Sequence, residues 1–389
     1  MRVLFSSVRF LGHLNPLLPY ARTLQARGHD VMVSAPVPVA ETLREAGMAH
    51  APVDHPDDAE RARLFSEAEG LAPEASVDFA IARFFVGMQA RIALPGLRDT
   101  VRDWRPDLIV RESGEFAAPV AAEEAGVPHV RVAVNNGGTQ RDRIRQAAEA
   151  LDGLRATVGL APDHGASLRA APAFTAFPAS LDGAGAPEGW PVPLRVRMPR
   201  EAAKSGGAVP AWAPRESEAF VYLTFGSVTA IMEDARGIYR KSLDAVEGLP
   251  LRALLTTGGG VTEDLLGPIP QNVTVEAWVP QGEVLPYADA VMCHGGSGSL
   301  LGAMEAGVPV VIAPLFADQP DNARIVDAAG VGVAVFNADA DSLRVAMERV
   351  LTEARFRTRA REVAREMAAM ADMDAAIDAM EAIVAAAGR

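Results

Sequence analysis

The stretch His294 to Ser299, HGGSGS, combines an imidazole, three glycines and two hydroxyls in six residues. It follows an apolar run that ends at Cys293 and opens a helical pattern beginning SLLGAMEA. The first N–H groups of a helix have no partner within the helix and carry partial positive charge. Glycines let phosphate oxygens approach these groups, and Ser297 and Ser299 add donors. The stretch predicts a diphosphate-binding turn, with a tight strand-to-helix turn as the alternative.

A rival interpretation of the same glycines is a dinucleotide fingerprint. Gly296, Gly298 and Gly302 form G-x-G-x-x-x-G, a spacing close to such fingerprints, and Asp318 would then bind a ribose. The spacing follows a late strand, whereas fingerprints follow the first strand of their unit, so this interpretation is the weaker one. The sequence contains no G-K-[ST] motif, which excludes a P-loop.

The elements around this turn alternate between short apolar strands and helical patterns, which is typical of a parallel sheet covered on both faces. Strand patterns of the first half of the chain occupy residues 2–7, 29–35, 106–110 and 128–134. Those of the second half occupy residues 219–227, 251–257, 272–278, 288–294, 308–314 and 331–335. We therefore predict an α/β protein with two Rossmann-like parallel sheets.

The domain boundaries follow from composition. Residues 201–218 are rich in Pro, Gly and small residues and are predicted to be a linker. The N-terminal domain is predicted over 1–200 and the C-terminal domain over 219–370, with a last helix over 371–389 that could pack back on the N-terminal domain. Within the N-terminal domain, Asn15 is a candidate N-cap of a helix whose first residue is Pro16.

Composition excludes several classes of function. The net charge of the 389 residues is -13, which argues against non-specific binding to nucleic acid or to an anionic membrane. Cys293 is the only cysteine, as expected in a reducing compartment. No apolar run approaches the roughly 18 residues of a membrane span. We expect a cytoplasmic protein that handles a small molecule, with at most peripheral membrane contact; a homodimer is compatible with the sequence.

Segments around the glycine-serine turn resemble a known family. Trp278-Val279-Pro280-Gln281, His294-Gly295-Gly296, Gly307-Val308-Pro309, residues 314–319 (PLFADQ), Asn322 and residues 12–31 (GHLNPLLPYARTLQARGHDV) carry the resemblance. Together they are similar to the nucleotide-sugar signature of family-one glycosyltransferases of the GT-B fold, of the bacterial natural-product type. The resemblance implies two Rossmann-like domains facing across a cleft, and sugar transfer with inversion. The partners implied are a nucleotide-diphosphate sugar and a small apolar hydroxylated acceptor, without a cofactor or metal.

The resemblance assigns residues to the nucleotide end of the donor. Trp278 would stack on the nucleobase, although a core tryptophan is the alternative. The backbone of Val279 would meet the base edge, and Gln281 could reach the ribose. In plant members a Glu eight residues after the motif His grips the ribose hydroxyls. The corresponding residue here is Gly302, so a donor without a 2′-hydroxyl loses nothing, and we favour dTDP over UDP.

Other residues are assigned to the diphosphate and the sugar. His294 would hydrogen-bond the diphosphate, with a histidine that merely ends a strand as the alternative. Asp318 and Gln319 would hold sugar hydroxyls, because a carboxylate accepts and an amide both accepts and donates; a helix N-cap is the alternative for Asp318. Ser227 would lie near the phosphates or the acceptor. The cradle for the diphosphate comprises Gly296, Ser297, Gly298 and Ser299.

The resemblance places catalysis in the N-terminal domain. His13 would deprotonate the acceptor hydroxyl, with a carboxylate orienting its ring. Glu112 stands where the family usually has Asp, and Glu115 is the other candidate for this carboxylate. A loop histidine without a catalytic role is the alternative for His13. Phe79, Phe84 and Met88 could line the acceptor pocket, although their helical spacing is also typical of a core.

Three other functions remain open at this point. An epimerase, a non-catalytic helper protein or, more remotely, a dehydrogenase could share this two-domain architecture. Two candidate metal motifs have simpler explanations. The Asp-x-Asp at Asp339 precedes a helical pattern, as a cap does, and His50 lies in a proline-rich stretch without a second ligand cluster. We predict no metal site.

Overall fold

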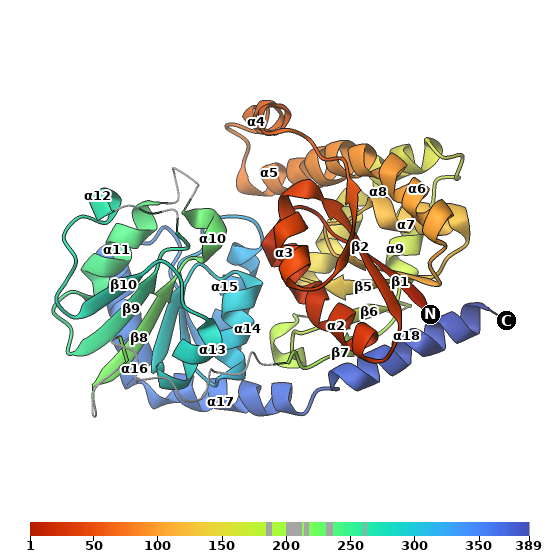
Figure 1. The fold of residues 1–389 in the computed structure, drawn as a ribbon. Helices are drawn as coiled ribbons and strands as arrows, with labels where there is room; N and C mark the ends of the chain where they lie inside the picture. Colours follow the sequence, from red (N-terminus) through yellow and green to blue (C-terminus); the bar gives the residue numbers. More distant parts are fainter. Residues whose placement is uncertain are drawn as a thin grey trace. The chain divides into compact units, whose positions relative to one another are not determined.

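The computed structural model describes residues 1–183, 189–199, 212–213, 218–230, 236–259, 261 and 263–388. The chain forms two compact units (Figure 1). The first unit comprises Met1–Ala176, Ala184–Pro199 and Ala371–Arg389, and the second comprises Phe177–Gly183 and Arg200–Met370. Most of the predicted linker 201–218 lies outside the described residues.

The first unit contains a seven-stranded parallel sheet with the order β3-β2-β1-β4-β5-β6-β7. Its strands are β1 (Arg2–Ser6), β2 (Asp30–Pro36), β3 (Ala49–Val53), β4 (Leu108–Glu112), β5 (His129–Ala133), β6 (Ala173–Thr175) and β7 (Leu194–Arg195). The strand order reverses direction between β1 and β4. At such a switch point, parallel sheets leave room for a ligand beyond the carboxyl ends of the strands.

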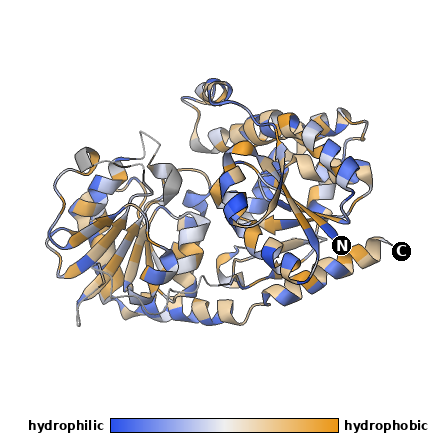
Figure 2. Ribbon diagram, in the orientation of Figure 1, coloured by the Kyte–Doolittle hydropathy of each residue, from blue (hydrophilic) through white to orange (hydrophobic). Residues whose placement is uncertain are grey.

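The second unit repeats this arrangement with six parallel strands in the order β10-β9-β8-β11-β12-β13. The strands are β8 (Ala219–Thr224), β9 (Leu251–Thr256), β10 (Val273–Glu276), β11 (Ala290–Cys293), β12 (Val310–Ile312) and β13 (Gly332–Ala334). The switch point lies between β8 and β11. Strands of both sheets are strongly hydrophobic (Figure 2), as expected of sheets buried on both faces. The predicted α/β class with two Rossmann-like sheets is confirmed.

Helices cover both faces of each sheet. The first unit has α1 (Leu11–Leu14), η1 (Asn15–Leu17), α2 (Leu18–Ala26), η2 (Val37–Val39), α3 (Ala40–Glu45), α4 (Asp58–Ser66), α5 (Pro73–Phe79), η3 (Ala80–Ala90), α6 (Arg91–Trp104), α7 (Ala117–Ala125), α8 (Gly137–Ala156), α9 (Ala166–Ala170) and α18 (Met373–Ala387). The second has η4 (Ala179–Leu181), α10 (Gly226–Thr229), α11 (Gly237–Val246), α12 (Glu263–Leu266), α13 (Gln281–Val284), η6 (Leu285–Tyr287), α14 (Ser297–Glu305), α15 (Gln319–Ala329), α16 (Ala340–Thr352) and α17 (Ala354–Ala368). No helix in the described part of the chain is both long and apolar enough to cross a membrane.

One local prediction, the N-cap at Asn15, was wrong. The first helical stretch begins at Leu11, and Asn15 already has helical angles, φ -55° and ψ -38°, so Asn15 is not an N-cap. The charged segment 56–75 contains α4. This helix begins with a capping box, in which Asp57 accepts from the Glu60 N–H at 2.7 Å and Glu60 accepts from the Asp57 N–H at 3.0 Å.

The C-terminal helix α18 packs against α2 within the first unit. Its apolar face places Ala376, Ile377 and Met380 in the core with residues of α2 and β1. At its edge, Arg27 of α2 donates to Asp374 at 2.9 Å and to Asp378 at 2.5 Å. These ion pairs are exposed and contribute little, so the buried apolar contacts are what hold α18 in place.

Replacing Ile377 by Ala should therefore destabilise the first unit by about 2–5 kcal/mol, because it opens a cavity at a fully buried site. The measurement is the free energy of unfolding from urea titration. Val345→Ala, at a side chain that is 55% exposed, is the matched control and should change it by less than about 0.5 kcal/mol. Equal effects of the two substitutions would contradict this role of α18.

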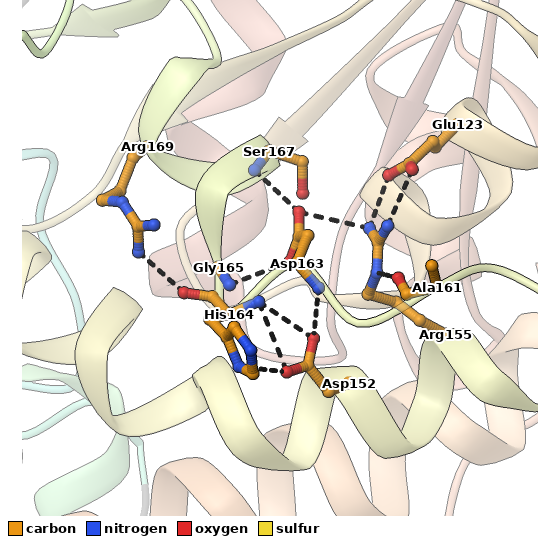
Figure 3. A network of polar contacts seen from close by, with 9 residues as sticks. All are labelled: Glu123, Asp152, Arg155, Ala161, Asp163, His164, Gly165, Ser167 and Arg169. Atoms are coloured by element: carbon orange, nitrogen blue, oxygen red, sulfur yellow. Dashed lines mark hydrogen bonds and ion pairs between the residues drawn. The ribbon is translucent and has the colours of Figure 1, made fainter.

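A polar network ties α7, α8 and α9 together (Figure 3). The buried guanidinium of Arg155 donates to both carboxylate oxygens of Glu123, at 2.5 and 2.7 Å, and to the Ala161 carbonyl at 2.8 Å. Asp163 accepts from the backbone N–H groups of Gly165 and Ser167 at the start of α9. The network therefore holds α7, α8 and α9 together and has a structural role in the first unit.

Candidate functional site

His13 and Glu112 meet at the carboxyl edge of the first sheet. His13 lies in α1, directly after β1, and Glu112 is the last residue of β4, the strand beside β1. The His13 Nδ1 lies 2.7 Å from Glu112 Oε2, with the carboxylate side chain fully buried and the imidazole 24% exposed. Glu112 also accepts from the backbone N–H of Gly114 at 2.5 Å. Its longer side chain reaches the histidine without difficulty.

The contact with the Glu112 carboxylate defines the tautomer of His13. An ionised carboxylate only accepts hydrogen bonds, so Nδ1 carries a hydrogen and Nε2 is the nitrogen that can take a proton. Glu115, the other candidate partner, accepts instead from the N–H groups of Ala117 and Ala118 at the start of α7. Burial raises the pKa of Glu115 to about 7. The structure thus pairs His13 with Glu112.

Aromatic rings surround the imidazole. The Phe85 ring is stacked with His13 at a centroid distance of 6.1 Å, and the Phe10 ring lies 6.0 Å away. A Cβ at Gly114 would lie 2.9 Å from His13 Cε1, so the ring needs a glycine there. Of the three predicted acceptor residues, Phe84 is buried, in line with the core alternative, whereas Phe79 and Met88 are half-buried.

The second unit contains the glycine-serine turn between β11 and α14. His294 follows β11, and its ring lies between two glycine-containing turns. A Cβ would lie 2.5 Å from His294 Nε2 at Gly296 and 2.9 Å from it at Gly226. Gly226 is the first residue of α10 and has φ +73°. Both glycines are therefore required by the imidazole ring. The importance of Gly226 was not predicted, because Gly226 and His294 are 68 positions apart in the sequence and no local pattern encodes their proximity.

The half-buried His294 is held in its neutral form. Burial lowers its pKa to about 4, despite the opposing effect of Asp318. At neutral pH its ring therefore has one donor and one acceptor nitrogen, and it brings no full charge to the turn. Its Nδ1 is buried without a hydrogen-bond partner among the described residues. The positive potential at this turn comes instead from the first N–H groups of α14.

Asp318 and the turn form one hydrogen-bonded group. Ser297 donates to Asp318 Oδ2 at 3.0 Å, and Asn322 donates to the same oxygen at 3.1 Å and to the Gly295 carbonyl at 2.9 Å. Asp318 occupies the N-cap position of α15, but its side chain makes no capping bond. The preceding Ala317 has φ +60°, a strained angle for a residue with a side chain, as often found at functional sites.

Gln319 is more constrained than predicted. Its side-chain carbonyl accepts from the backbone N–H groups of Leu315 at 2.8 Å and Phe316 at 3.0 Å, and the residue is buried. This fixes the loop that leads to Asp318. Only the NH₂ half of the Gln319 amide is therefore left for a ligand.

Trp278 and Gln281 follow β10. The Trp278 side chain is 70% exposed, so the alternative of a core tryptophan is excluded. Val279 is half-buried beside it. Gln281 donates to Ser299 at 3.3 Å, and a Cβ at Gly302 would lie 3.0 Å from Gln281 Oε1. The amide of Gln281 thus lies where a side chain at position 302 would begin.

Comparison with known proteins decides the family. Residues 22–155 and 243–383 match the N-terminal and C-terminal domains described as Erythromycin biosynthesis protein CIII-like. The chain is 33% identical over 359 residues to the L-demethylnoviosyl transferase of Streptomyces niveus, covering 89% of this chain and 88% of that protein. This chain belongs to the family-one glycosyltransferases of natural-product biosynthesis.

Solved structures agree with this assignment to the glycosyltransferases. The glycosyltransferase SnogD from Streptomyces nogalater matches with a TM-score of 0.77 at 27% identity, over 99% of both chains. The glycosyltransferase VinC in complex with DTDP matches with a TM-score of 0.77 at 23% identity, again over 99% of both chains. The fold of this glycosyltransferase is therefore GT-B.

Three predictions for this glycosyltransferase remain, and they concern Ser227, Asp339 and His50. The side chain of Ser227 lies outside what the structure describes. Asp339 caps α16 by accepting from the Ser342 N–H at 2.8 Å. This agrees with the predicted helix cap rather than with a metal motif. His50 bonds the Ala35 carbonyl, and the described residues contain no group of three or more metal-ligating side chains.

Proposed function

We propose that this glycosyltransferase moves a sugar, with inversion, from a dTDP-sugar to a hydroxyl of a small apolar acceptor bound by the first unit. The observation that carries the proposal is the 2.7 Å contact between His13 Nδ1 and Glu112. It presents a histidine with a defined tautomer at the edge where a sheet of this type binds ligands. A non-catalytic helper protein would have no need of such a base.

The proposed reaction is a single displacement. His13 Nε2 removes the proton from the acceptor hydroxyl as its oxygen attacks the anomeric carbon. The bond between that carbon and the diphosphate oxygen breaks, and both of its electrons leave with the diphosphate. Glu112 stabilises the imidazolium that forms, because its buried carboxylate is within hydrogen-bond distance.

The departing diphosphate gains charge, and the turn before α14 is suited to stabilise it. The N–H groups of Ser297, Gly298 and Ser299 begin the helix, where partial positive charge collects. The neutral ring of His294 and the Ser299 hydroxyl add donors, whereas the Ser297 hydroxyl already donates to Asp318. We propose that these groups act without a metal ion, while Asp318 and the Gln319 NH₂ group hold the sugar.

The nucleotide would be bound by Trp278, Val279 and Gln281. Exposed Trp278 offers a face for stacking, worth about 1–3 kcal/mol per base. Gly302 offers no side chain to a ribose 2′-hydroxyl, and Gln281 lies in that space. The dTDP bound to VinC supports the same preference in a related fold.

Thermal unfolding in the presence of dTDP, UDP and NAD tests the proposal. A nucleotide at 100 times its Kd stabilises the protein by about 2.7 kcal/mol, so dTDP should raise the Tm by roughly 5–10 °C. We expect a smaller shift with UDP at the same concentration and none with NAD. A shift with NAD alone would mean that the glycine-serine turn binds a dinucleotide.

A further inference from the structure

A small pocket lies inside the first unit, beside the catalytic pair. It lies between the carboxyl ends of β1 and β2 and the helical segments η3 and α6. Its walls include Ser6, Ser34, Phe85, Gln89 and Gly114. The volume open to the centre of a water molecule is about 10 Å³, close to the least that holds one water. The pocket therefore has room for a group the size of one hydroxyl.

Two polar atoms of this pocket lack partners. Ser34 Oγ and Gln89 Oε1 are buried and make no hydrogen bond to the described residues. Ser34 is 0% exposed and Gln89 is 4% exposed. Buried polar atoms in native proteins are nearly always paired, and leaving one unpaired destabilises the fold. Two such atoms in one pocket indicate a bound group that forms hydrogen bonds with both of them.

The pocket shares two walls with the surroundings of His13. The Phe85 ring lines the pocket and is also stacked with the His13 ring. Gly114 lines the pocket, and a Cβ at Gly114 would lie 2.9 Å from His13 Cε1. Phe85 and Gln89 both belong to η3, a π-helical segment. Such segments are rare and frequently lie at functional sites.

The chemistry of the two atoms defines their ligand. Gln89 Oε1 can only accept, so the ligand must donate to it, whereas the Ser34 hydroxyl can donate. A hydroxyl group satisfies both and matches the volume. We propose that this pocket binds a second, non-reacting hydroxyl of the acceptor, which donates to Gln89 Oε1 and accepts from Ser34 Oγ. The inference rests on the proposed function, which puts the acceptor beside His13.

Binding measurements with matched aromatic probes test this inference without requiring sugar transfer. The probes are dihydroxynaphthalenes and dihydroxyanthraquinones, each paired with its monohydroxy analogue, and the readout is the Kd from calorimetry or ligand-observed NMR. In the unmodified enzyme at least one diol should bind roughly tenfold more tightly than its analogue. Gln89→Met and Ser34→Ala should each reduce this preference to about threefold or less. Gln25→Met and Ser66→Ala, at exposed positions, should leave it unchanged.

The possible outcomes separate this inference from the proposed function. Equal binding of every diol and its analogue, no binding of any probe, or a preference that survives both substitutions would mean that the pocket holds a structural water only. If the unmodified enzyme shows the binding preference but transfers sugar to no acceptor, the proposed function is rejected and the inference about the pocket stands. If Gln89→Met unfolds, Ser34→Ala carries the test alone.

Discussion

Replacing His13 by Ala should lower kcat for sugar transfer by about 10²–10⁴-fold, the usual effect of losing a general base. The substitution removes the nitrogen that takes the acceptor proton. It leaves the buried carboxylate of Glu112, which still accepts from the Gly114 N–H at 2.5 Å, so the loop after β4 should keep its structure. The measurement is the steady-state rate of transfer with saturating donor and acceptor.

Two further variants make the His13 result specific. Glu112→Gln keeps the size of the side chain but removes the charge that stabilises the imidazolium, so it should lower kcat by less than His13→Ala. His164→Ala removes a histidine whose side chain is 85% exposed and whose partner is Asp152, and it should leave kcat unchanged. Near-normal turnover by the His13→Ala enzyme would rule out His13 as the base.

Replacing His294 by Ala should lower kcat/KM for the donor by about 10²–10³-fold, the usual effect of losing one donor to a developing oxyanion. The ring occupies the space between Gly226 and Gly296, and its depressed pKa of about 4 keeps it neutral. A neutral donor can stabilise the departing diphosphate at every pH well above 4. The measurement is kcat/KM for the dTDP-sugar between pH 6 and 8, where the loss should be constant.

The control for His294 asks whether the loss comes from the hydrogen bond or from a collapsed turn. His294→Asn keeps an N–H donor in a smaller side chain and should recover part of the activity lost in His294→Ala. His55→Ala removes a histidine that bonds only its neighbouring Pro56 carbonyl among the described residues, and it should have no effect. An Asn variant as inactive as the Ala variant would indicate a packing role for the ring.

The sequence predicted all six strands of the second sheet and four of the seven strands of the first, because these strands are apolar and separated by helical periodicity. It missed β3, β6 and β7; β6 has three residues and β7 has two, too few for a periodic pattern. In the second unit, for example, the patterns at residues 251–257 and 288–294 became β9 and β11 with nearly the same bounds. The glycine-serine turn was likewise predictable, since a strand end, two glycines and a helix start are adjacent along the chain. The partner choice between Glu112 and Glu115 was not, because it depends on where each carboxylate points after β4 ends.

Other features depend on tertiary contacts that leave no local pattern. The π-helical geometry of η3, which contains Phe85 and Gln89, looks like an ordinary helix in the sequence. The side-chain carbonyl of Gln319 is used by the backbone of Leu315 and Phe316, which a motif comparison does not reveal. The contact of His294 with Gly226 likewise required the pairing of β8 with β11.

The central claim assigns donor binding to the glycine-serine turn and proton removal to His13. Calorimetric titration of dTDP into the His13→Ala and His294→Ala enzymes tests this division most directly. We predict that His13→Ala binds dTDP within about twofold of the unmodified enzyme, whereas His294→Ala binds it roughly tenfold or more weakly, as expected when one hydrogen bond to a charged group is lost. Weakened dTDP binding in His13→Ala together with unchanged binding in His294→Ala would contradict the account.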